Sequence, residues 1–304
     1  MRFGQIVIGP SGSGKSSYCA TLKSSLKRKT AIVNLDPAND ALPYEPDIDI
    51  TDLISLPFVM EKLKLGPNAS LIYCFEYILK NISWLTDKLK AFSDHYFLFD
   101  TPGQIELYTH NEALPAIIEL LQKQGITLCI VNLIDSHHIT DPHKFISATL
   151  LSLTSMFNLA FPHINVLSKI DLLSTYEKEP AFNLDFYCQV ADLSYLLHQI
   201  EESGSEWDKK HKRLTEALID VIQDYSLVSF LPMSVNDPET IAEVIVHVDR
   251  AISFIDFKRA TEVLNEEKSN LNSIQSLVGL ADRFGFLDVQ ERYSKYDDIE
   301  EEEE

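Results

Sequence analysis

The chain has 304 residues, of which 45% are hydrophobic and 24% are charged, so its composition is that of a folded globular protein. Its 26 Lys and Arg against 46 Asp and Glu give a formal charge of −20, which argues against a protein that coats nucleic acid or binds an anionic membrane. A small anionic ligand is still allowed, because backbone N–H groups, one lysine and a metal ion are enough to hold it.

In chain order, short apolar runs alternate with amphipathic stretches up to about residue 255. The apolar runs predict buried strands at 3–8, 30–34, 96–99, 127–134, 165–168 and 227–230. The stretches between them predict helices, for example at 15–28, 71–92, 112–123, 144–159, 214–225 and 238–257. This alternation is typical of an α/β fold with a doubly wound, mainly parallel sheet, and the longer stretches suggest helical insertions.

We therefore expect one domain over residues 1–257 and a polar C-terminal extension over residues 258–304. The last twenty residues hold nine acids and two bases, and this block of like charge predicts a disordered acidic tail. Such a tail either keeps the protein soluble or docks onto a basic partner.

The sequence predicts a cytoplasmic protein with no membrane anchor, and it leaves shuttling to the nucleus open. No apolar run approaches the ~20 residues that a membrane-spanning helix needs, and the segment before Gly9 is too short for a signal peptide. The cysteines are scattered and form no Cys-x-x-Cys pair, as is usual for free thiols in a reducing compartment. They are Cys19, Cys74, Cys129 and Cys188.

Residues 9–16 read GPSGSGKS and match the phosphate-binding pattern G-x-x-x-x-G-K-[S/T] between a predicted strand and a predicted helix. Glycines let the backbone curl so that successive N–H groups face phosphate oxygens. We expect Lys15 to reach the terminal phosphates and the Ser16 hydroxyl to bind Mg²⁺. The predicted nucleotide-binding residues of this segment are Gly9, Ser11, Gly12, Ser13, Gly14, Lys15, Ser16 and Ser17.

A second signal follows the predicted strand at 96–99, where Asp100 is followed three residues later by Gly103. A carboxylate at the carboxyl end of a strand beside a phosphate loop can hold Mg²⁺, usually through water. Gly103 could turn its N–H towards a γ-phosphate, which would make the next loop sensitive to hydrolysis. Alone, these residues form an ordinary turn, but after a phosphate loop the metal-binding interpretation is favoured.

A third signal places Ser168, Lys169 and Asp171 at the end of the predicted strand at 165–168. The Asp171 carboxylate could accept hydrogen bonds from the N1–H and N2–H₂ groups of guanine, which adenine lacks, while the Lys169 stem covers the purine face. This arrangement resembles the guanine-specificity motif of GTPases, with Ser168 where many have Asn. A solvated loop is the alternative for Lys-x-Asp alone, but three such segments at strand ends are typical of the crevice of a P-loop NTPase sheet.

Four segments together resemble the GPN-loop GTPase family, and they occur in the family's order. They are residues 34–39 (NLDPAN), 66–68 (GPN), 100–106 (DTPGQIE) and 135–136 (DS). Two further runs, 182–185 (FNLD) and 192–196 (DLSYL), look most like the second eukaryotic paralogue. The resemblance covers roughly residues 3–255, and the segment after residue 258 carries little of it.

The resemblance implies that the GPN loop, Gly66, Pro67 and Asn68, reaches across a dimer to the partner's nucleotide. Asn68 would then contact the phosphate region where other GTPases use an arginine finger. For these residues alone the alternative is a helix start capped by Asn68, and both roles can coexist. Residues 9–16 lack the second P-loop lysine of related dimeric ATPases, which fits an Asn68 that acts on the partner.

Three further residues complete the predicted catalytic set. Asp36 follows the second predicted strand, where the family carries a carboxylate near Mg²⁺ and the attacking water. Gln104 and Glu106 lie in the segment that would sense the γ-phosphate, and both are candidates for orienting that water. For Glu106, a surface helix without catalytic duty is the alternative.

Two other segments are weaker candidates. His137, His138 and His143, with Asp135 and Asp141, have the residue types of metal ligands. They follow a predicted strand and lack the spacing of a known site, so a polar loop with a helix cap is favoured. Residues 231–234 (LPMS), placed after the last predicted strand, could wrap the guanine with backbone groups.

The sequence thus predicts a Mg²⁺-dependent enzyme that binds GTP and GDP and works as a dimeric switch. The resemblance implies a homodimer, or a heterodimer with another GPN-loop GTPase. It also implies assistance in the assembly and nuclear import of RNA polymerase II, through contacts with its subunits or assembly factors and without direct contact to nucleic acid. Two alternatives stay open: a GTP-binding assembly scaffold with little turnover, and a P-loop nucleotide kinase.

Overall fold

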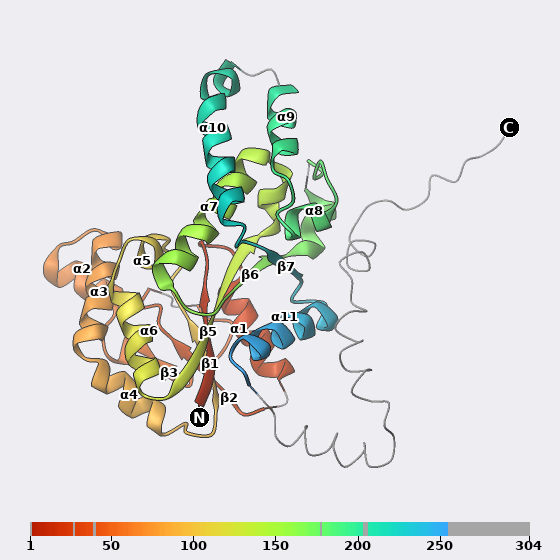
Figure 1. The fold of residues 1–304 in the computed structure, drawn as a ribbon. Coiled ribbons are helices and arrows are strands. Elements are labelled where there is room, and N and C mark those ends of the chain that lie inside the picture. The colour runs from red at the N-terminus through yellow and green to blue at the C-terminus, as the bar shows by residue number, and fades with distance from the viewer. Residues whose placement is uncertain (1, 27, 39–40, 177, 203–205, 255–304) are drawn as a thin grey trace, which may run out of the picture.

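The computed structural model describes residues 2–254, apart from residues 27, 39–40, 177 and 203–205. Figure 1 shows a central sheet with helices packed on both of its faces. The predicted extension at 258–304, its acidic tail and the last residues of the helix predicted at 238–257 lie outside the described residues.

Within these residues, seven parallel strands form one sheet in the order β3-β2-β4-β1-β5-β6-β7. The strands are β1 Arg2–Ile8, β2 Thr30–Asn34, β3 Ile48–Asp49, β4 Tyr96–Asp100, β5 Ile126–Asp135, β6 His163–Ser168 and β7 Phe230–Met233. The predicted mainly parallel sheet is confirmed. β1 lies between β4 and β5, where the direction of winding reverses, and ligands of open α/β sheets bind at this position.

The prediction for the last strand is wrong, since β7 runs from Phe230 to Met233 rather than over 227–230. Leu227 is 52% exposed and precedes the strand. β7 lies at the edge of the sheet, where Pro232 is tolerated because an edge strand needs hydrogen bonds on one side only. Residues 231–233 therefore belong to the strand, and the loop at its carboxyl end begins at Ser234.

The helices cover the sheet and also form two insertions, α2–α4 between β3 and β4 and α8–α10 between β6 and β7. They are α1 Lys15–Ser25, α2 Leu56–Leu63, α3 Pro67–Lys80, α4 Ile82–Lys90, α5 Glu106–Thr109, α6 Ala113–Lys123, α7 Pro142–Leu159, α8 Leu184–Cys188, α9 Ser194–Glu202, α10 Glu206–Tyr225 and α11 Pro238–Ala251. In the described part of the chain, none of them is long and apolar enough to cross a membrane. The four cysteines are buried and free, as predicted.

Alternation along β1 explains the double winding. Ile6 and Ile8 belong to a core on one face with Ile117 of α6, whereas Val7 belongs to a core on the other face with Val244 of α11. Successive side chains of a strand point to opposite faces, so a strand with apolar side chains on both faces has to be covered twice. Figure 1 shows α3, α4 and α6 on one side of the sheet and α1 and α11 on the other.

Three predicted helices end elsewhere than expected, the first of them at Ser25 of α1 rather than at residue 28. The helix predicted at 71–92 is divided into α3 and α4 at Asn81, whose side-chain amide donates to the Tyr77 carbonyl at 2.8 Å and whose backbone leaves helical geometry. α11 ends at Ala251, and Ser253 just beyond it has a φ of 52°, a left-handed conformation that stops a helix.

The carboxyl ends of the strands bring the predicted site segments together. β1 leads into residues 9–16, β4 ends at Asp100, and β6 ends at Ser168. Val7 pairs with Asp100 between β1 and β4, so the phosphate loop and the predicted metal carboxylate start from neighbouring positions. Because all the strands run parallel, the three segments meet at the same end of the sheet, the one formed by the carboxyl ends of the strands.

Candidate functional site

The loop between β1 and α1 is shaped by glycine. Gly9 has a φ of 143°, and a Cβ atom there would lie 2.3 Å from the Leu133 carbonyl oxygen, so no larger residue fits. Ser13 donates its backbone N–H to the Pro10 carbonyl at 3.2 Å, and α1 begins at Lys15. The predicted phosphate loop therefore lies at a helix N-terminus, which favours an anion.

Lys15 is held inside this loop. Its side chain is largely buried, and its ammonium donates to the carbonyl oxygens of Gly9 and Pro10 at 3.0 and 2.9 Å. Burial lowers the pKa of Lys15, while the charges of Asp100 and Asp36 raise it. The predicted lysine and both predicted carboxylates are thus close enough to interact electrostatically.

Asp100 is buried at the end of β4, with 1% of its surface exposed. Its Oδ2 atom accepts the Tyr44 hydroxyl at 2.7 Å. Within the described residues its Oδ1 atom is buried without a partner. Burial raises the pKa of Asp100, and the hydroxyls of Ser16 and Tyr44 and the charge of Lys15 only partly offset it. An unpartnered carboxylate oxygen beside a serine hydroxyl fits a hard cation such as Mg²⁺.

Asp36 is held just after β2 by Asn34. The Asn34 side-chain oxygen accepts the Asp36 backbone N–H at 3.0 Å, and its amide donates to Asp49 at 3.1 Å. The Asp36 carboxylate accepts the Ala38 N–H at 2.9 Å. Burial raises the pKa of Asp36 despite this bond, and the charge of Asp100 raises it further. The sequence identified Asp36, but it did not assign Asn34 the role of holding it.

Gly103 packs directly on the phosphate loop. A Cβ atom at Gly103 would lie 2.7 Å from the Ser11 Cα atom and 2.8 Å from its backbone nitrogen, so this close approach requires glycine. Thr101 anchors the same segment to β1 by donating its hydroxyl to the Val7 carbonyl at 2.7 Å. The predicted switch glycine therefore touches the loop whose ligand it would sense.

Gln104 and Glu106 follow Gly103 at the start of α5. Glu106 is the first residue of this four-residue helix and is exposed, and Gln104 is partly exposed. Among the residues that the structure describes, neither side chain has a hydrogen-bond partner. Glu106 therefore lies on a surface helix, with its side chain accessible to solvent.

Lys169 joins the predicted base-reading segment to the phosphate loop. Its ammonium donates to the Gly12 carbonyl at 2.6 Å and to Asp135 Oδ2 at 2.7 Å. The buried Ser168 hydroxyl lies 2.8 Å from the Ser13 carbonyl oxygen. Burial alone would raise the pKa of Asp135, but its hydrogen bonds, led by that from Lys169, lower it. Asp135 belongs to one of the family-like segments, and the sequence considered it only as a weak candidate metal ligand and not as a partner of Lys169.

Asp171 lies two residues further, in the 3-10 helix η3 (Ile170–Thr175). Lys169 precedes this helix with a φ of 61°, which turns the chain at the end of β6. The Asp171 Oδ2 atom accepts the side-chain amide of Asn236 at 3.1 Å. Asn236 follows β7 and was not predicted, since no motif includes it. Of the segment predicted to wrap the base, only Ser234 follows the strand.

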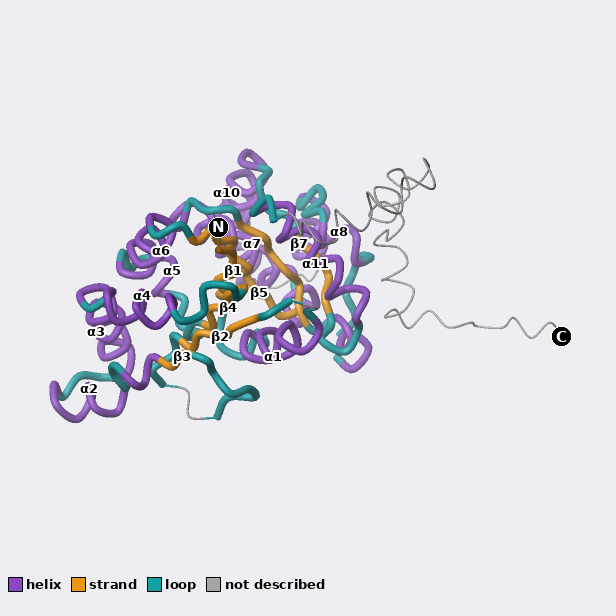
Figure 2. Tube along the Cα trace, turned by 90° about the horizontal axis from the view of Figure 1, so that it is seen from below, coloured by secondary structure: helices purple, strands orange, loops and turns teal. Residues whose placement is uncertain are grey.

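The GPN loop lies at the start of α3. Gly66 is the N-cap residue, Pro67 is the first helical residue, and Asn68 is the second. The predicted cap role of Asn68 is wrong: the helix start has no side-chain cap, because Gly66 occupies the capping position. Residues 61–69 are all exposed, and Figure 2 shows α2 and α3 on the β3 side of the molecule. The loop is therefore presented to solvent.

The histidine segment forms helix caps. Asp135 accepts the His137 N–H at 2.9 Å and caps the 3-10 helix η2 (Ser136–Thr140). Asp141 accepts the His143 N–H at 2.9 Å and caps α7. The polar loop and helix cap predicted here are confirmed. In the described ranges, no group of three or more His, Cys, Asp or Glu could hold a metal ion.

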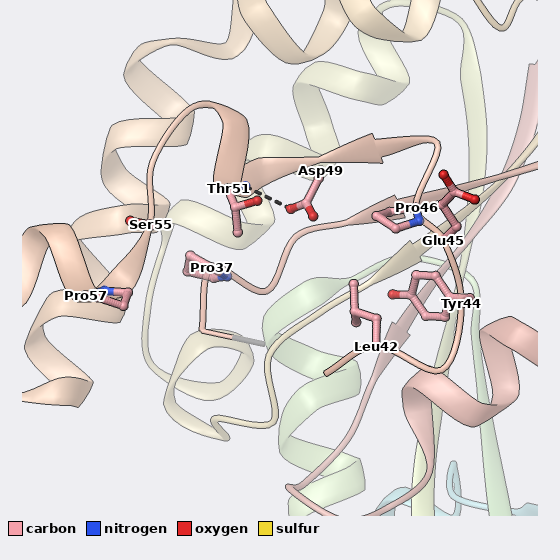
Figure 3. A pocket seen from close by; sticks show the side chains of 9 residues that line it. All are labelled: Pro37, Leu42, Tyr44, Glu45, Pro46, Asp49, Thr51, Ser55 and Pro57. Carbon is pink, nitrogen blue, oxygen red and sulfur yellow. Dashed lines mark hydrogen bonds between the residues drawn. The ribbon is translucent and has the colours of Figure 1, made fainter. Parts of the chain in front are cut away.

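A pocket of about 650 Å³ opens beside the segment that follows β2. Figure 3 shows Tyr44, Asp49 and Thr51 on its wall, and all of its lining comes from residues 37–57. Its lining includes no residue of the phosphate loop. Tyr44 connects the pocket to the candidate site, because its hydroxyl donates to Asp100. Tyr44 lies in an irregular, proline-rich segment without a periodic pattern, so no sequence signal identifies it.

Comparison with known proteins identifies several relatives. A family model described as "Conserved hypothetical ATP binding protein" matches residues 7–254. The chain is 48% identical to GPN-loop GTPase 2 of Danio rerio, over 96% of this chain and 93% of that protein. It is 48% identical to GPN-loop GTPase QQT1 of Arabidopsis thaliana over 84% and 86%, respectively. It is 40% identical to GPN-loop GTPase 2 of Saccharomyces cerevisiae over 97% and 87%.

Among solved structures, the apo form of a GTPase from Pyrococcus abyssi resembles this chain with a TM-score of 0.65. The match covers 83% of this chain and 98% of that one, at 22% sequence identity. At this identity the likeness shows a shared fold, which is that of the P-loop NTPases.

We predict that Asp100→Asn stabilises the nucleotide-free protein at neutral pH. Folding raises the pKa of Asp100, so ionising this carboxyl costs stability as the pH rises through the raised pKa. A neutral amide avoids that cost, so thermal unfolding near neutral pH should give a higher Tm for the variant. The difference should shrink as the pH falls towards the ordinary value of 3.8, where the wild-type carboxyl is protonated as well.

Asp94→Asn is the matched control, because Asp94 is an exposed aspartate just before β4, and its Tm should equal that of the wild type. A Tm for Asp100→Asn below that of the wild type at neutral pH would show that Asp100 is stabilised as an anion.

Proposed function

The chain belongs to the GPN-loop GTPase family and is a GTP-binding GTPase, and we propose that it hydrolyses GTP with Mg²⁺ as a dimeric switch. The relatives compared above are all named GTPases, which gives the nucleotide-kinase alternative no support. The observation that carries the proposal is the buried group of Lys15, Asp36 and Asp100 beside a glycine-shaped phosphate loop.

Ser16 and Asp100 hold the magnesium ion in this proposal. The Asp100 Oδ1 atom, which has no partner in the described residues, and the nearby Ser16 hydroxyl support it, because hard cations take oxygen ligands. When bound, Mg²⁺ neutralises charge on the β- and γ-phosphates. The Tyr44 hydroxyl has to leave Asp100 or share it as the nucleotide binds.

Lys15 exchanges its two carbonyl partners for the terminal phosphates, and Gly103 contacts the γ-phosphate from the neighbouring loop. Asp36, Gln104 and Glu106 position the attacking water. Phosphoryl transfer needs little covalent chemistry from the protein, so positioning and charge neutralisation supply most of the rate.

Asp171 accepts the N1–H and N2–H₂ groups of guanine, and Lys169 covers the purine face. The contact of Lys169 with the Gly12 carbonyl supports this assignment, because it sets the base-reading segment against the phosphate loop. Asp171 is partly exposed next to Asn236, which leaves its carboxylate accessible to a base.

We predict that Asp171→Asn exchanges the preference for guanine for a preference for xanthine. Xanthine carries a carbonyl where guanine has its 2-amino group, so the new amide can donate where the carboxylate accepted. Equilibrium binding should show GTP affinity reduced about tenfold to a hundredfold, as expected for the loss of charge-assisted hydrogen bonds, and a gain for xanthosine triphosphate. A GTP affinity equal to that of the wild type and of Asp94→Asn would refute the base-reading role.

The proposed dimer places Asn68 at the partner's nucleotide. In its own chain, Asn68 lies in the exposed segment 61–69 at the start of α3, a helix that Figure 2 shows on the β3 side of the molecule. Four large apolar side chains in α2, α3 and the segment between them are at least 36% exposed: Phe58, Leu63, Leu65 and Tyr73. Clusters of exposed apolar and aromatic side chains are typical of protein interfaces and support a dimer contact at the GPN loop.

A mixing experiment tests this role of Asn68. Asn68→Ala should bind GTP but hydrolyse it roughly a hundredfold more slowly, as expected when one transition-state donor is lost. Lys15→Ala should bind GTP poorly but still present Asn68. In an equimolar mixture, the Lys15→Ala chain supplies Asn68 to the nucleotide of its partner, so phosphate release should exceed that of either variant alone.

The control replaces Lys15→Ala with the double variant Lys15→Ala/Asn68→Ala, which should restore nothing. Full activity of Asn68→Ala by itself would remove Asn68 from the mechanism. A mixture that forms dimers without any recovery would show that Asn68 does not act across a homodimer.

We further propose, from the family resemblance, that this switch assists the assembly and nuclear import of RNA polymerase II. It would act in the cytoplasm and shuttle to the nucleus, as a homodimer or with another GPN-loop GTPase. The formal charge of −20 supports contacts with proteins rather than with nucleic acid.

Affinity purification from cells with wild-type and Lys15→Ala protein, read by mass spectrometry, tests this role. Polymerase subunits or assembly factors should be recovered with the wild type and in a different amount with Lys15→Ala. The same partners in the same amounts with both proteins would contradict a nucleotide-dependent switch and favour the scaffold alternative.

A further inference from the structure

The loop after β7 carries an asparagine that contacts the proposed base reader. The Asn236 Nδ2 atom donates to Asp171 Oδ2 at 3.1 Å, although the two residues are 65 positions apart in the chain. They meet because β6 and β7 pair directly, with Ser168 opposite Met233 at their carboxyl ends. The contact therefore links two loops at the carboxyl ends of the strands, where the phosphate loop also lies.

A buried turn fixes the backbone of Asn236. Its N–H donates to the Ser234 hydroxyl at 3.1 Å, and the Asp237 N–H donates to the Ser234 carbonyl at 3.2 Å. The Thr240 hydroxyl accepts the Ser234 N–H at 3.1 Å. Ser234 and Thr240 are almost completely buried, so the exposed side chain of Asn236 starts from a rigid base.

The hydrogen bond between Asn236 and Asp171 can run only from the amide to the carboxylate. An ionised carboxylate only accepts hydrogen bonds, so the group that holds Asp171 has to be a donor, and the Asn236 amide is a donor without charge. Each oxygen of Asp171 can accept more than one bond, so the contact at Oδ2 leaves acceptor sites for the N1–H and N2–H₂ groups of guanine. A carboxylate that is already oriented loses less rotational freedom when the base binds.

We propose that Asn236 is a positioning residue for guanine recognition, which orients the Asp171 carboxylate so that both of its oxygens face the base. This proposal rests on the proposed role of Asp171 as the guanine reader. It assigns the loop after β7 a part in nucleotide specificity through a side chain.

The turn itself does not need the Asn236 side chain. It uses the backbone N–H of Asn236, which any residue except proline supplies, and the side chains of Ser234 and Thr240. The cap of α11 belongs to Asp237, which accepts the Glu239 N–H at 2.9 Å. Substitution of Asn236 should therefore leave β7 and α11 folded.

Equilibrium binding of GTP and inosine triphosphate to the full-length chain tests the proposal. Inosine triphosphate lacks the 2-amino group, so it makes only one of the two bonds to Asp171. Asn236→Ala should weaken GTP binding about three- to tenfold, the effect of one ordinary hydrogen bond, and weaken inosine triphosphate binding less. Asn236→Asp, of nearly the same shape, should weaken GTP binding further, because two facing carboxylates repel each other.

Asn158→Ala is the matched control, because it removes another exposed asparagine whose amide donates a hydrogen bond. The Asn158 amide donates to the Tyr108 carbonyl at 2.8 Å. It should change neither affinity nor the ratio of the two affinities. Thermal unfolding of each variant confirms that the chain is folded at the assay temperature.

Two results would overturn the proposal while the base reader stands. In the first, both Asn236 variants keep the wild-type affinity for GTP and the wild-type ratio of GTP to inosine triphosphate affinity, while Asp171→Asn has lost GTP binding. In the second, the Asn236 variants weaken the binding of GTP and of inosine triphosphate equally. If Asp171→Asn itself keeps its GTP affinity, the base reader is wrong and the positioning role of Asn236 falls with it.

Discussion

Burial of charge at the carboxyl end of β1 is the constraint on which the rest of the site depends. Lys15, Asp36 and Asp100 interact with one another while being largely withdrawn from water. Burial shifts the pKa of each towards its uncharged form, down for the lysine and up for both aspartates. Charges in this situation are incompletely compensated by the protein alone. A ligand that brings phosphate oxygens and a cation therefore stabilises this site more than it would stabilise the same residues in water.

Around this charged group, the segments at the carboxyl ends of two strands, β4 and β6, contact the phosphate loop. Gly103, after β4, packs on Ser11, while Ser168 and Lys169, at the end of β6, lie against the carbonyl oxygens of Ser13 and Gly12. The metal segment and the base segment thus each touch the phosphate loop directly. A rearrangement of the phosphate loop therefore directly affects the segments that would sense hydrolysis and read the base.

Sequence patterns could predict the segments of the site but not the contacts between them. The phosphate loop, Asp100 and Asp171 each follow an apolar run, so their positions at strand ends are visible without a structure. Tyr44 reaches Asp100 across 56 positions and Asn236 reaches Asp171 across 65, and such pairs depend on which strands are neighbours. Periodicity reports whether a strand is buried, and it contains no information on the order of strands in the sheet.

The errors in the fold have local causes. β3 has only two residues, too few to produce a pattern, and Pro232 argues against a strand unless that strand is known to lie at an edge. Asn81 divides one long apolar periodicity into two helices through a side-chain bond to the backbone. The capping interpretation of Asn68 failed by two positions, because Pro67 at the first helical position moves the cap to Gly66.

The two strands at the borders of the described sheet also limit how another chain can join it. β3 is two residues long, and β7 has four residues of which Pro232 lacks an N–H group. Neither border offers a long row of backbone donors and acceptors, so extension of the sheet by a strand from another molecule is disfavoured. A partner has to be met by side chains on helices and loops, such as those around the GPN loop. Contacts of that kind can separate and form again while every ladder of backbone hydrogen bonds in the sheet stays intact.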